Sequence, residues 1–419
     1  MHFWLVNPFD PLPSDQGFRP MRYQMLVAEL VRRGHTVTWL CSDFLHIPKI
    51  YRRTDTLRDL PRGLRAVLIH TRPYRKNVSL ARLINHSEYS AAVRQWMARN
   101  PPPDGIIVSY PLPESALDCL RYGRAHAVPV VVDVQDLWPD QFLDLVPRRL
   151  RWVGRLALTP MFFQSREVFR LAENCVAVSQ YYLRAVTERR GTPFPYSHVY
   201  YLGYEPSIVD GDQDEGLPDL LARGFTPATT NIVFVGTLGT TYDIDTLIEA
   251  ARTLAHDAPQ VRFYLAGDGP MRNAWEAKVQ ALGLQNVTFL GFLDIARLRA
   301  LLTHSFAGLV AFRGNLHSIP NKPNEYMAFG LPLISSLKGE LQQVIDSEPL
   351  GVSYEARDPA SLMRALRRLL DEPGFADRCR QRVRQVFAER FSARSIYPTY
   401  VNDLERICSS RAPVQELVL

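Results

Sequence analysis

The fold of this chain is constrained most by a pattern of short apolar strands and amphipathic helices that begins twice. In the first half, His2 to Asn7 predicts a strand, and Met21 to Arg33 predicts a helix with one apolar stripe. In the second half, Asn231 to Val235 predicts a strand, and Ile244 to Leu254 predicts the helix that follows it. Strands that alternate with helices form parallel sheets covered by helices. The pattern therefore predicts two successive α/β sheets.

A chain of 419 residues is too long for one ordinary core, so two domains are expected. We assign residues 1–205 to the first domain and residues 231–385 to the second. Residues 206–230 are acidic and rich in loop-forming residues, and we predict that they are a linker. The last segment, residues 386–419, is predicted to be helical and to pack back across both domains.

The composition is that of a soluble globular protein, with 46% hydrophobic and 22% charged residues. The net charge of +6 is compatible with phosphorylated ligands or an anionic membrane surface, and is too weak to predict a nucleic-acid partner. The five cysteines lack Cys-x-x-Cys spacing, and no apolar run approaches the roughly 20 residues of a membrane span. No secretion signal is recognisable. We therefore expect a cytoplasmic protein, with association at the cytoplasmic membrane face left open.

The segment from Phe312 to Ser336 concentrates the residues that can bind an anion. It predicts a loop with Arg313 and Lys322, then a short helix from about Pro323 that carries Glu325 in its first turn. Cations and a helix N-terminus favour negative charge, while a carboxylate accepts hydrogen bonds from hydroxyl groups. This chemistry fits a diphosphate with a ribose attached.

A second group of candidate residues follows the predicted strand Pro129 to Asp133. Gln135, Asp136 and Trp138 would lie at the carboxyl end of this strand, where parallel sheets bind ligands. Asp136 could equally cap the next helix. Gly17, in the loop after the first strand, would lie at the same edge of the sheet and is a weaker signal.

The stretch from Val146 to Phe169 mixes arginines with large apolar side chains. Such a helix could lie against anionic lipid headgroups. It could also be an ordinary amphipathic helix with a solvated basic face, and this second interpretation is favoured about two to one.

Taken together, the motifs resemble glycosyltransferase family 4, the retaining sugar transferases of the GT-B fold. They are Phe18 to His35, Val235-Gly-Thr-Leu-Gly, Leu265-Ala-Gly-Asp-Gly-Pro, Asn286-Val-Thr-Phe-Leu-Gly-Phe, and Ile319-Pro-Asn-Lys-Pro-Asn-Glu-Tyr-Met-Ala-Phe-Gly-Leu-Pro. Asp136-Leu-Trp-Pro looks most like the branch that transfers amino-deoxysugars such as L-fucosamine in bacterial surface polysaccharides. The resemblance implies two Rossmann-like α/β/α domains facing across a cleft, with a C-terminal helix that crosses back to the first domain.

The resemblance also assigns roles, and the chain departs from the family at three of them. Glu325 matches the second Glu of the Glu-x7-Glu motif, which binds the ribose of the donor, but the first Glu falls at His317. The family lysine that binds the diphosphate falls at about Tyr242, so Lys322 and Arg313 are the implied replacements. A His-Asp pair common in the family is Gln135-Asp136 here.

The implied site residues fall into three groups. Lys322, Arg313 and Asp136 are catalytic; Gly17, Gly236, Thr237, Leu238, Phe292, His317, Asn321 and Glu325 bind the donor; and Arg22, Gln135 and Trp138 lie on the acceptor side. No metal or other cofactor is expected, because the ten histidines are dispersed.

The implied function is metal-independent, retaining transfer of a sugar from a nucleotide-sugar, with UDP favoured. The acceptor would belong to polysaccharide or glycoconjugate assembly and could be lipid-linked. Two alternatives remain open: a nucleotide-sugar 2-epimerase of the same fold, and a non-catalytic partner of an active transferase.

Overall fold

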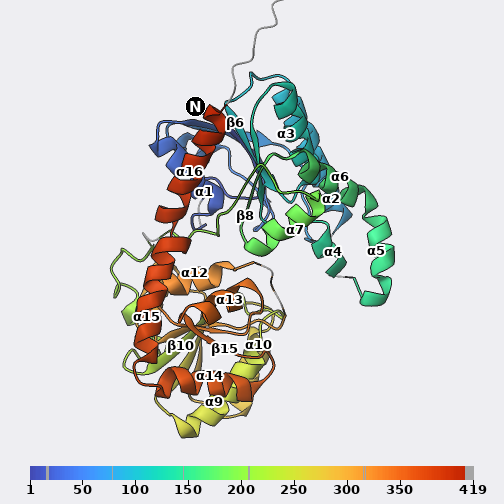
Figure 1. Cartoon of the computed structure of the whole chain (residues 1–419). Helices are drawn as coiled ribbons and strands as arrows, with labels where there is room; N and C mark the ends of the chain where they lie inside the picture. Colours follow the sequence, from blue (N-terminus) through green and yellow to red (C-terminus); the bar gives the residue numbers. More distant parts are fainter. Residues whose placement is uncertain are drawn as a thin grey trace, which may run out of the picture. The chain divides into compact units, whose positions relative to one another are not determined.

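A computed structural model describes residues 1–15, 18–77, 79–144, 146–205, 208–314, 316 and 318–410 (Figure 1). Gly17 and His317, both predicted to bind the donor, lie outside the described residues. The chain divides into two compact units. Unit 1 contains Met1–Tyr201 and Ile396–Leu419, and unit 2 contains Leu202–Ser395.

Unit 1 is built on a seven-stranded parallel sheet in the order β5-β2-β1-β6-β7-β8-β9. Its strands are β1 (His2–Val6), β2 (Thr36–Ser42), β5 (Leu64–Ile69), β6 (Gly105–Tyr110), β7 (Val130–Val134), β8 (Asn174–Ala177) and β9 (Tyr196–Val199). Strands β6 and β7 lie inside the sheet and are buried by helices on both faces. They are therefore apolar along almost their whole length. A short antiparallel pair, β3 (Phe44–Leu45) and β4 (Ile50–Tyr51), lies outside this sheet.

Helices cover both faces of the unit 1 sheet (Figure 1). The crossover helices α2, α3, α6 and α7 pack against one another in sequence, whereas α1 contacts the end of α16 through Arg33 and Glu405, 3.2 Å apart. The helices are α1 (Arg22–Arg32), α2 (Leu80–Met97), α3 (Pro113–Ala125), α4 (Asp140–Asp144), α5 (Arg151–Ala157), α6 (Thr159–Leu171), α7 (Gln180–Arg190) and the unit 1 part of α16 (Ala393–Ser409); η1 (Asp55–Asp59) and η2 (Arg148–Leu150) are 3-10 turns.

Unit 2 contains a six-stranded parallel sheet in the order β12-β11-β10-β13-β14-β15. Its strands are β10 (Thr230–Val235), β11 (Val261–Ala266), β12 (Val287–Gly291), β13 (Ala307–Val310), β14 (Leu333–Ser335) and β15 (Gly351–Ser353). Strand β11, which follows β10 in the chain, lies on one side of β10 in the sheet, and β13 lies on its other side. The carboxyl ends of β10 and β13 are therefore the topological switch point, where open α/β sheets bind ligands.

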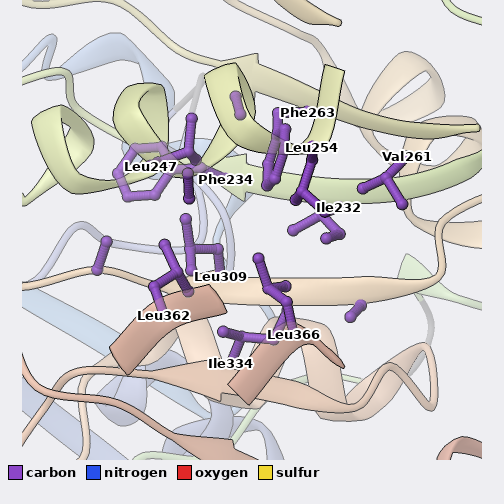
Figure 2. Close-up of a cluster of buried hydrophobic side chains, with 14 of the residues drawn as sticks. Ile232, Phe234, Leu247, Leu254, Val261, Phe263, Leu309, Ile334, Leu362 and Leu366 are labelled. Atoms are coloured by element: carbon purple, nitrogen blue, oxygen red, sulfur yellow. The ribbon is translucent and has the colours of Figure 1, made fainter. Parts of the chain in front are cut away.

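A large buried cluster of unit 2 lies between the sheet and four of its helices, α9, α10, α14 and α15. Figure 2 shows Leu247 and Leu254 of α9 and Leu362 and Leu366 of α14 with the buried side chains of the strands, among them Phe234. Trp275 of α10 belongs to the same cluster. The helices of unit 2 are α8 (Leu217–Ala222), α9 (Ile244–Asp257), α10 (Arg272–Ala281), α11 (Ile295–Thr303), α12 (Asn321–Ala328), α13 (Glu340–Ser347), α14 (Pro359–Asp371) and α15 (Phe375–Val386). Two parallel α/β sheets are thus confirmed.

The segment predicted to be a linker, residues 206–230, belongs to unit 2 in the structure. Its helix α8 packs on α11, and its acidic side chains pair with residues of that helix and the turn after it. Asp219 pairs with Arg297, and Asp214 lies 2.6 Å from the imidazole of His304. Two of the acidic residues that made this segment look like a solvated linker, Asp214 and Asp219, thus contact α11 or the turn after it.

The C-terminal segment, predicted to be helical, is helical in the structure but interrupted near its start. After α15, a π-helical turn spans Phe387–Phe391, and Ser392 is extended with φ −72° and ψ 137°. Tyr204 pairs with Ser392 at this break, where its backbone N–H donates to Phe391 O at 3.0 Å. Helix α16 then begins in unit 2, and its residues from Ile396 onward belong to unit 1.

Candidate functional site

The floor of the candidate site in unit 2 is a row of glycines at the carboxyl ends of three adjacent strands. Gly236, Gly267 and Gly291 follow or end β10, β11 and β12, and they are connected by backbone hydrogen bonds, including Gly267 N–H to Gly291 O at 2.7 Å. Gly267 has φ +136°, and a Cβ atom there would lie 2.0 Å from the carbonyl oxygen of Gly236. A side chain is therefore excluded at Gly267, which lets the two strand ends approach each other closely.

Helix α12 is held over the switch point by Tyr326. Its ring packs on Gly308 of β13, where a Cβ atom would lie only 2.3 Å from the ring. Its hydroxyl accepts from the backbone N–H of Val235 at 2.8 Å and donates to Leu309 O at 3.3 Å. One buried side chain thus joins the ends of β10 and β13 and sets the position of the helix above them.

Lys322, in the first turn of α12, places its ammonium group directly above Gly236. A Cβ atom on Gly236 would lie 2.4 Å from Lys322 Nζ. The Nζ atom lies 3.6 Å from the centre of the Tyr242 ring and 4.2 Å from that of Phe234, which are cation–π distances. This atom is buried and has no hydrogen-bond partner among the described residues. A buried donor without a partner is costly, so the geometry indicates that a ligand supplies the acceptor.

The environment of Lys322 changes its protonation. Burial lowers the pKa of its amine to about 7, and the nearby carboxylate of Glu325 opposes this shift. The family lysine is expected at about Tyr242, and the Tyr242 ring contacts the Lys322 ammonium in the structure. This contact supports the prediction that Lys322 replaces the family lysine.

Glu325 lies one turn further along α12 and is only 6% exposed. Its Oε1 atom accepts from the Tyr204 hydroxyl at 3.2 Å. Tyr204 was missed by sequence reasoning, since it lies outside the matched motifs and reaches Glu325 only through the fold of unit 2.

Arg313 has a different environment from that of Lys322. Its guanidinium pairs with Asp245 of α9, which also lies 3.2 Å from Lys278 Nζ. Its backbone N–H donates to Thr241 O at 2.9 Å, so Arg313 follows the strand end next to the Tyr242 loop. A role of Arg313 in diphosphate binding stays a prediction, and it would require one guanidinium to serve both Asp245 and the ligand.

The other residues predicted to bind the donor differ in their exposure to solvent. Leu238 was predicted to bind the donor, and this stays a prediction; its side chain is fully buried in the core of unit 2. Its backbone instead joins two loops, donating to Asp268 O and accepting from Met271 N–H, both at 2.9 Å. Thr237 and Asn321 are exposed, and Phe292 is 78% exposed after Gly291.

In unit 1, Arg22 was predicted to lie on the acceptor side, but it is 3% exposed and paired with Asp133 of β7. Its Nε and Nη2 atoms lie 2.8 and 3.1 Å from the two carboxylate oxygens, and Nη1 donates to Tyr200 O at 2.9 Å. The structure therefore gives Arg22 a structural role, since its donors are used inside unit 1. The pairing of Arg22 with Asp133 could not be predicted from the sequence, because the two residues are far apart in the chain.

Trp138 lines a pocket of about 230 Å³ in unit 1. His86 stacks on the Trp138 ring at 5.4 Å and also lines the pocket, with Glu114 and Gln164 as further polar groups. Arg82 lies over the Trp138 ring at 4.8 Å. Burial, with a contribution from Arg82, lowers the pKa of His86 to about 3, so its imidazole is neutral. The pocket combines an aromatic wall with neutral and acidic hydrogen-bonding groups.

Gln135 and Asp136 follow β7 in unit 1. Asp136 accepts from the Gln141 side chain at 3.1 Å, and burial raises the pKa of its carboxyl group. Gln135 Nε2 is a buried donor without a partner in the described part of the chain. Both residues therefore retain hydrogen-bonding capacity at the carboxyl edge of the sheet, where the sequence predicts them.

Two kinds of feature are absent from the described residues. No group of three or more His, Cys, Asp or Glu side chains there is arranged to hold a metal ion. No helix within the same ranges is long and apolar enough to cross a membrane.

The comparisons with known proteins agree with these two units. The family model "Glycosyl transferase 4-like domain" matches residues 21–203, and "Glycosyl transferases group 1" matches residues 229–372. The chain belongs to the group 1 glycosyltransferases. The second matched range contains Gly236, Lys322 and Glu325, and the first contains Asp136 and Trp138.

Two curated glycosyltransferases are similar in sequence. One is the alpha-D-kanosaminyltransferase of Streptomyces kanamyceticus, 25% identical over 49% of this chain and 53% of that protein. The other is the 2-deoxystreptamine N-acetyl-D-glucosaminyltransferase of Niallia circulans, 22% identical over 41% of this chain and 44% of that protein. The matches thus span about half the length of these relatives.

Solved structures share the fold over nearly the whole chain. Anabaena HepE, solved in complex with UDP, superposes with a TM-score of 0.68 at 15% identity and covers 97% of this chain and 99% of its own. Sucrose-phosphate synthase from Thermosynechococcus elongatus superposes with a TM-score of 0.70 at 16% identity over 98% of this chain and 100% of its own. The fold of this glycosyltransferase is therefore the GT-B fold.

Proposed function

We propose that this chain transfers a sugar from a nucleotide-sugar to an acceptor, and that unit 2 binds the nucleoside diphosphate at its switch point. The observation that carries the proposal is the Lys322 ammonium, which is buried without a hydrogen-bond partner among the described residues and lies against Gly236. A diphosphate oxygen would complete the hydrogen bonding of this donor. We propose UDP as the nucleotide, in keeping with the sequence analysis; HepE, of the same fold, was solved with UDP.

Lys322 would act on the leaving group of the reaction. As the bond between the anomeric carbon and the diphosphate oxygen breaks, negative charge develops on the phosphate, and the ammonium stabilises it electrostatically. In a retaining mechanism the acceptor oxygen bonds to the same face of the sugar, and its proton passes to the leaving phosphate. We propose that this reaction does not depend on a metal ion.

Glu325 would bind the ribose of the donor. Its carboxylate can accept hydrogen bonds from ribose hydroxyls, and the Tyr204 hydroxyl orients it by donating to Oε1. Lys322 and Glu325 are three residues apart on α12 and therefore lie on the same side of the helix. In this proposal Lys322 binds the diphosphate and Glu325 binds the ribose.

The acceptor is proposed to be a sugar or lipid-linked oligosaccharide in polysaccharide or glycoconjugate assembly. By their names, the two similar curated proteins transfer an amino sugar, which suits the amino-deoxysugar branch named above. The Trp138 pocket of unit 1, with its neutral His86, is the candidate for contacts with the acceptor.

A thermal-shift panel of UDP, GDP and ADP tests the donor proposal. We expect UDP to raise the melting temperature, because a ligand that binds only the folded state stabilises it. Glu325→Ala should remove this shift, whereas Glu372→Ala, at a surface carboxylate of unit 2, should keep it. If none of the nucleotides gives a shift, the donor site is not where we place it. UDP binding without transfer to any acceptor would favour the non-catalytic alternative, and epimerised donor without acceptor would favour the epimerase.

Donor affinity should fall as the pH rises above neutrality. The Lys322 amine, with a pKa of about 7 in the free protein, is charged below that pH and neutral above it. Only the charged form attracts a diphosphate strongly, so binding above pH 7 takes up a proton. The titration of Lys322 should change the Kd for UDP little below pH 7. Above pH 7 it should raise the Kd by up to about tenfold per pH unit.

Calorimetric titration in buffers with different ionisation enthalpies measures this proton uptake directly. The groups that face Lys322 are Glu325 and the Tyr242 phenol, and burial raises the pKa of Tyr242 above its ordinary value, so it does not titrate near neutrality. Titrations at pH 8 and above, where a terminal phosphate with a second pKa of about 6 is fully ionised, exclude the titration of UDP itself. An absence of proton uptake at these pH values would contradict the prediction.

A further inference from the structure

The region between Val146 and Arg166 in unit 1 has an unusual charge. It contains five arginines and no aspartate or glutamate. Its centre is α5, a seven-residue helix in which no residue is buried. Figure 1 shows α5 at the edge of unit 1, away from the sheet.

Large apolar side chains of this region remain exposed. Trp152 is 70% exposed, Leu156 69% and Phe163 66%. An ordinary amphipathic helix buries its apolar stripe against the core and leaves its polar face in water. Helix α5 does not, so the interpretation of this stretch as such a helix is wrong for α5. Helix α6 does follow the rule further on, where Val168 and Phe169 are fully buried.

The exposed apolar surface continues onto the start of α2. Leu80 is 72% exposed, and Leu83 lines the same pocket as Ala157 and Leu158 at the end of α5. We call this surface the α5 patch; it consists of Leu80, Leu83, Leu150, Trp152, Val153, Leu156 and Phe163 with the exposed arginines Arg149, Arg151, Arg155 and Arg166.

The arginines lie among the apolar side chains. Arg155, for example, has its guanidinium 5.4 Å from the centre of the Phe162 ring. An apolar surface surrounded by cations is complementary to a bilayer with anionic headgroups, because the side chains enter the acyl boundary while the guanidinium groups bind phosphate. A protein partner of the same area would need many acidic side chains to match.

We propose that the α5 patch docks unit 1 on the surface of an anionic lipid bilayer. Trp152, Leu156 and Phe163 enter the interface, and the arginines bind lipid phosphates. If the proposed transferase function holds, this contact brings unit 1 to an acceptor carried by the membrane. The docking itself is independent of donor binding, which belongs to unit 2.

Co-sedimentation of the full chain with phosphatidylcholine vesicles, with and without phosphatidylglycerol, tests the proposal. We expect binding only when phosphatidylglycerol is present. Trp152→Ala/Leu156→Ala should abolish this binding. Arg151→Gln/Arg155→Gln should weaken the partition coefficient about thirtyfold, since each basic residue near such a surface contributes about a fivefold factor.

Matched control variants change exposed residues of unit 2. Leu221→Ala/Leu282→Ala removes two exposed leucines, and Arg252→Gln/Arg364→Gln removes two exposed arginines. Both should bind vesicles as the unchanged chain does. Circular dichroism and the UDP thermal shift of every variant establish that it is folded and that its donor site is intact.

Trp152 is the only exposed tryptophan among the described residues, so its fluorescence emission reports whether this side chain enters the bilayer interface. It should shift to shorter wavelength with phosphatidylglycerol vesicles, and Trp152→Phe should remove the shift. Equal binding to both vesicle types, no binding to either, or equal binding by the α5-patch variants and their controls would overturn the proposal. Self-association in solution that is lost in Trp152→Ala/Leu156→Ala, without vesicle binding, would identify the patch as an interface between two copies.

Discussion

Replacing Lys322 by methionine is expected to abolish detectable UDP binding and to lower kcat/KM by about a hundredfold to a thousandfold. Removing one preorganised contact to developing charge typically costs about 3–4 kcal/mol in the barrier. Methionine keeps much of the length and the apolar stem of lysine, so the packing against Phe234 and Tyr242 is retained while the charge is lost. Calorimetric titration with UDP and a transfer assay measure the two effects.

The stability of the same variant separates the site from the fold. Burial without a partner lowers the pKa of Lys322 below its value in the unfolded chain, so the unfolded state binds more protons between about pH 7 and 10.5. In that window the stability of the unliganded protein rises with pH through this group, and below it the charged amine is destabilising. Lys322→Met should therefore melt at the same or a higher temperature near pH 7.

The control is Lys338→Met, since Lys338 pairs with Glu355 at the surface of unit 2. It should bind UDP normally and gain no stability. A Lys322→Met protein that binds UDP with unchanged affinity would refute the donor site, even if it were perfectly folded.

Asp133→Asn should destabilise unit 1 by about 3–5 kcal/mol, because it leaves the buried Arg22 guanidinium without its counter-charge. Asp133 is fully buried at 0% exposure and also faces the Tyr400 hydroxyl at 3.4 Å. This one carboxylate therefore joins α1, β7 and the middle of α16. A loss of this size corresponds to a fall in melting temperature of roughly 10 °C for a unit of this size.

Urea unfolding followed by tryptophan emission measures this loss. Five of the six tryptophans (Trp4, Trp39, Trp96, Trp138 and Trp152) belong to unit 1, so the emission reports mainly on that unit. The two units need not unfold together, and the unit 1 transition is the one to compare.

The double variant Arg22→Met/Asp133→Leu distinguishes a paired charge from a packing defect. Replacing a buried ion pair by apolar residues is often neutral or stabilising, so the double variant should recover most of the stability lost in Asp133→Asn. If it is as unstable as the single variant, the ion pair is not the cause. If Asp133→Asn itself is fully stable, the pair contributes nothing that water cannot replace.

The parallel sheets could be predicted from the sequence because they depend on local patterns. Strands buried on both faces are continuous apolar runs, as in Gly105–Tyr110, and amphipathic helices repeat every three to four residues, as in α1. The long helix α2 was missed, since its apolar and polar residues are distributed around it without a clear stripe. The contacts of residues 208–230 with α11 could not be predicted, because acidic side chains look the same in sequence whether they face solvent or an arginine of a neighbouring helix.

The sequence by itself determined which residues of this chain we propose to bind a nucleotide. Lys322 and Glu325 were found from their charge and their place in a short helix, since the motif specifies residue type and spacing. Their environment was decided only by the tertiary structure. Burial against Phe234 and Tyr242 comes from strands and loops some eighty residues away, and it turns Lys322 from an ordinary surface cation into an unpartnered amine. Arg22 and Arg313 show the converse, because their partners, Asp133 and Asp245, are distant in sequence and only the fold brings them together.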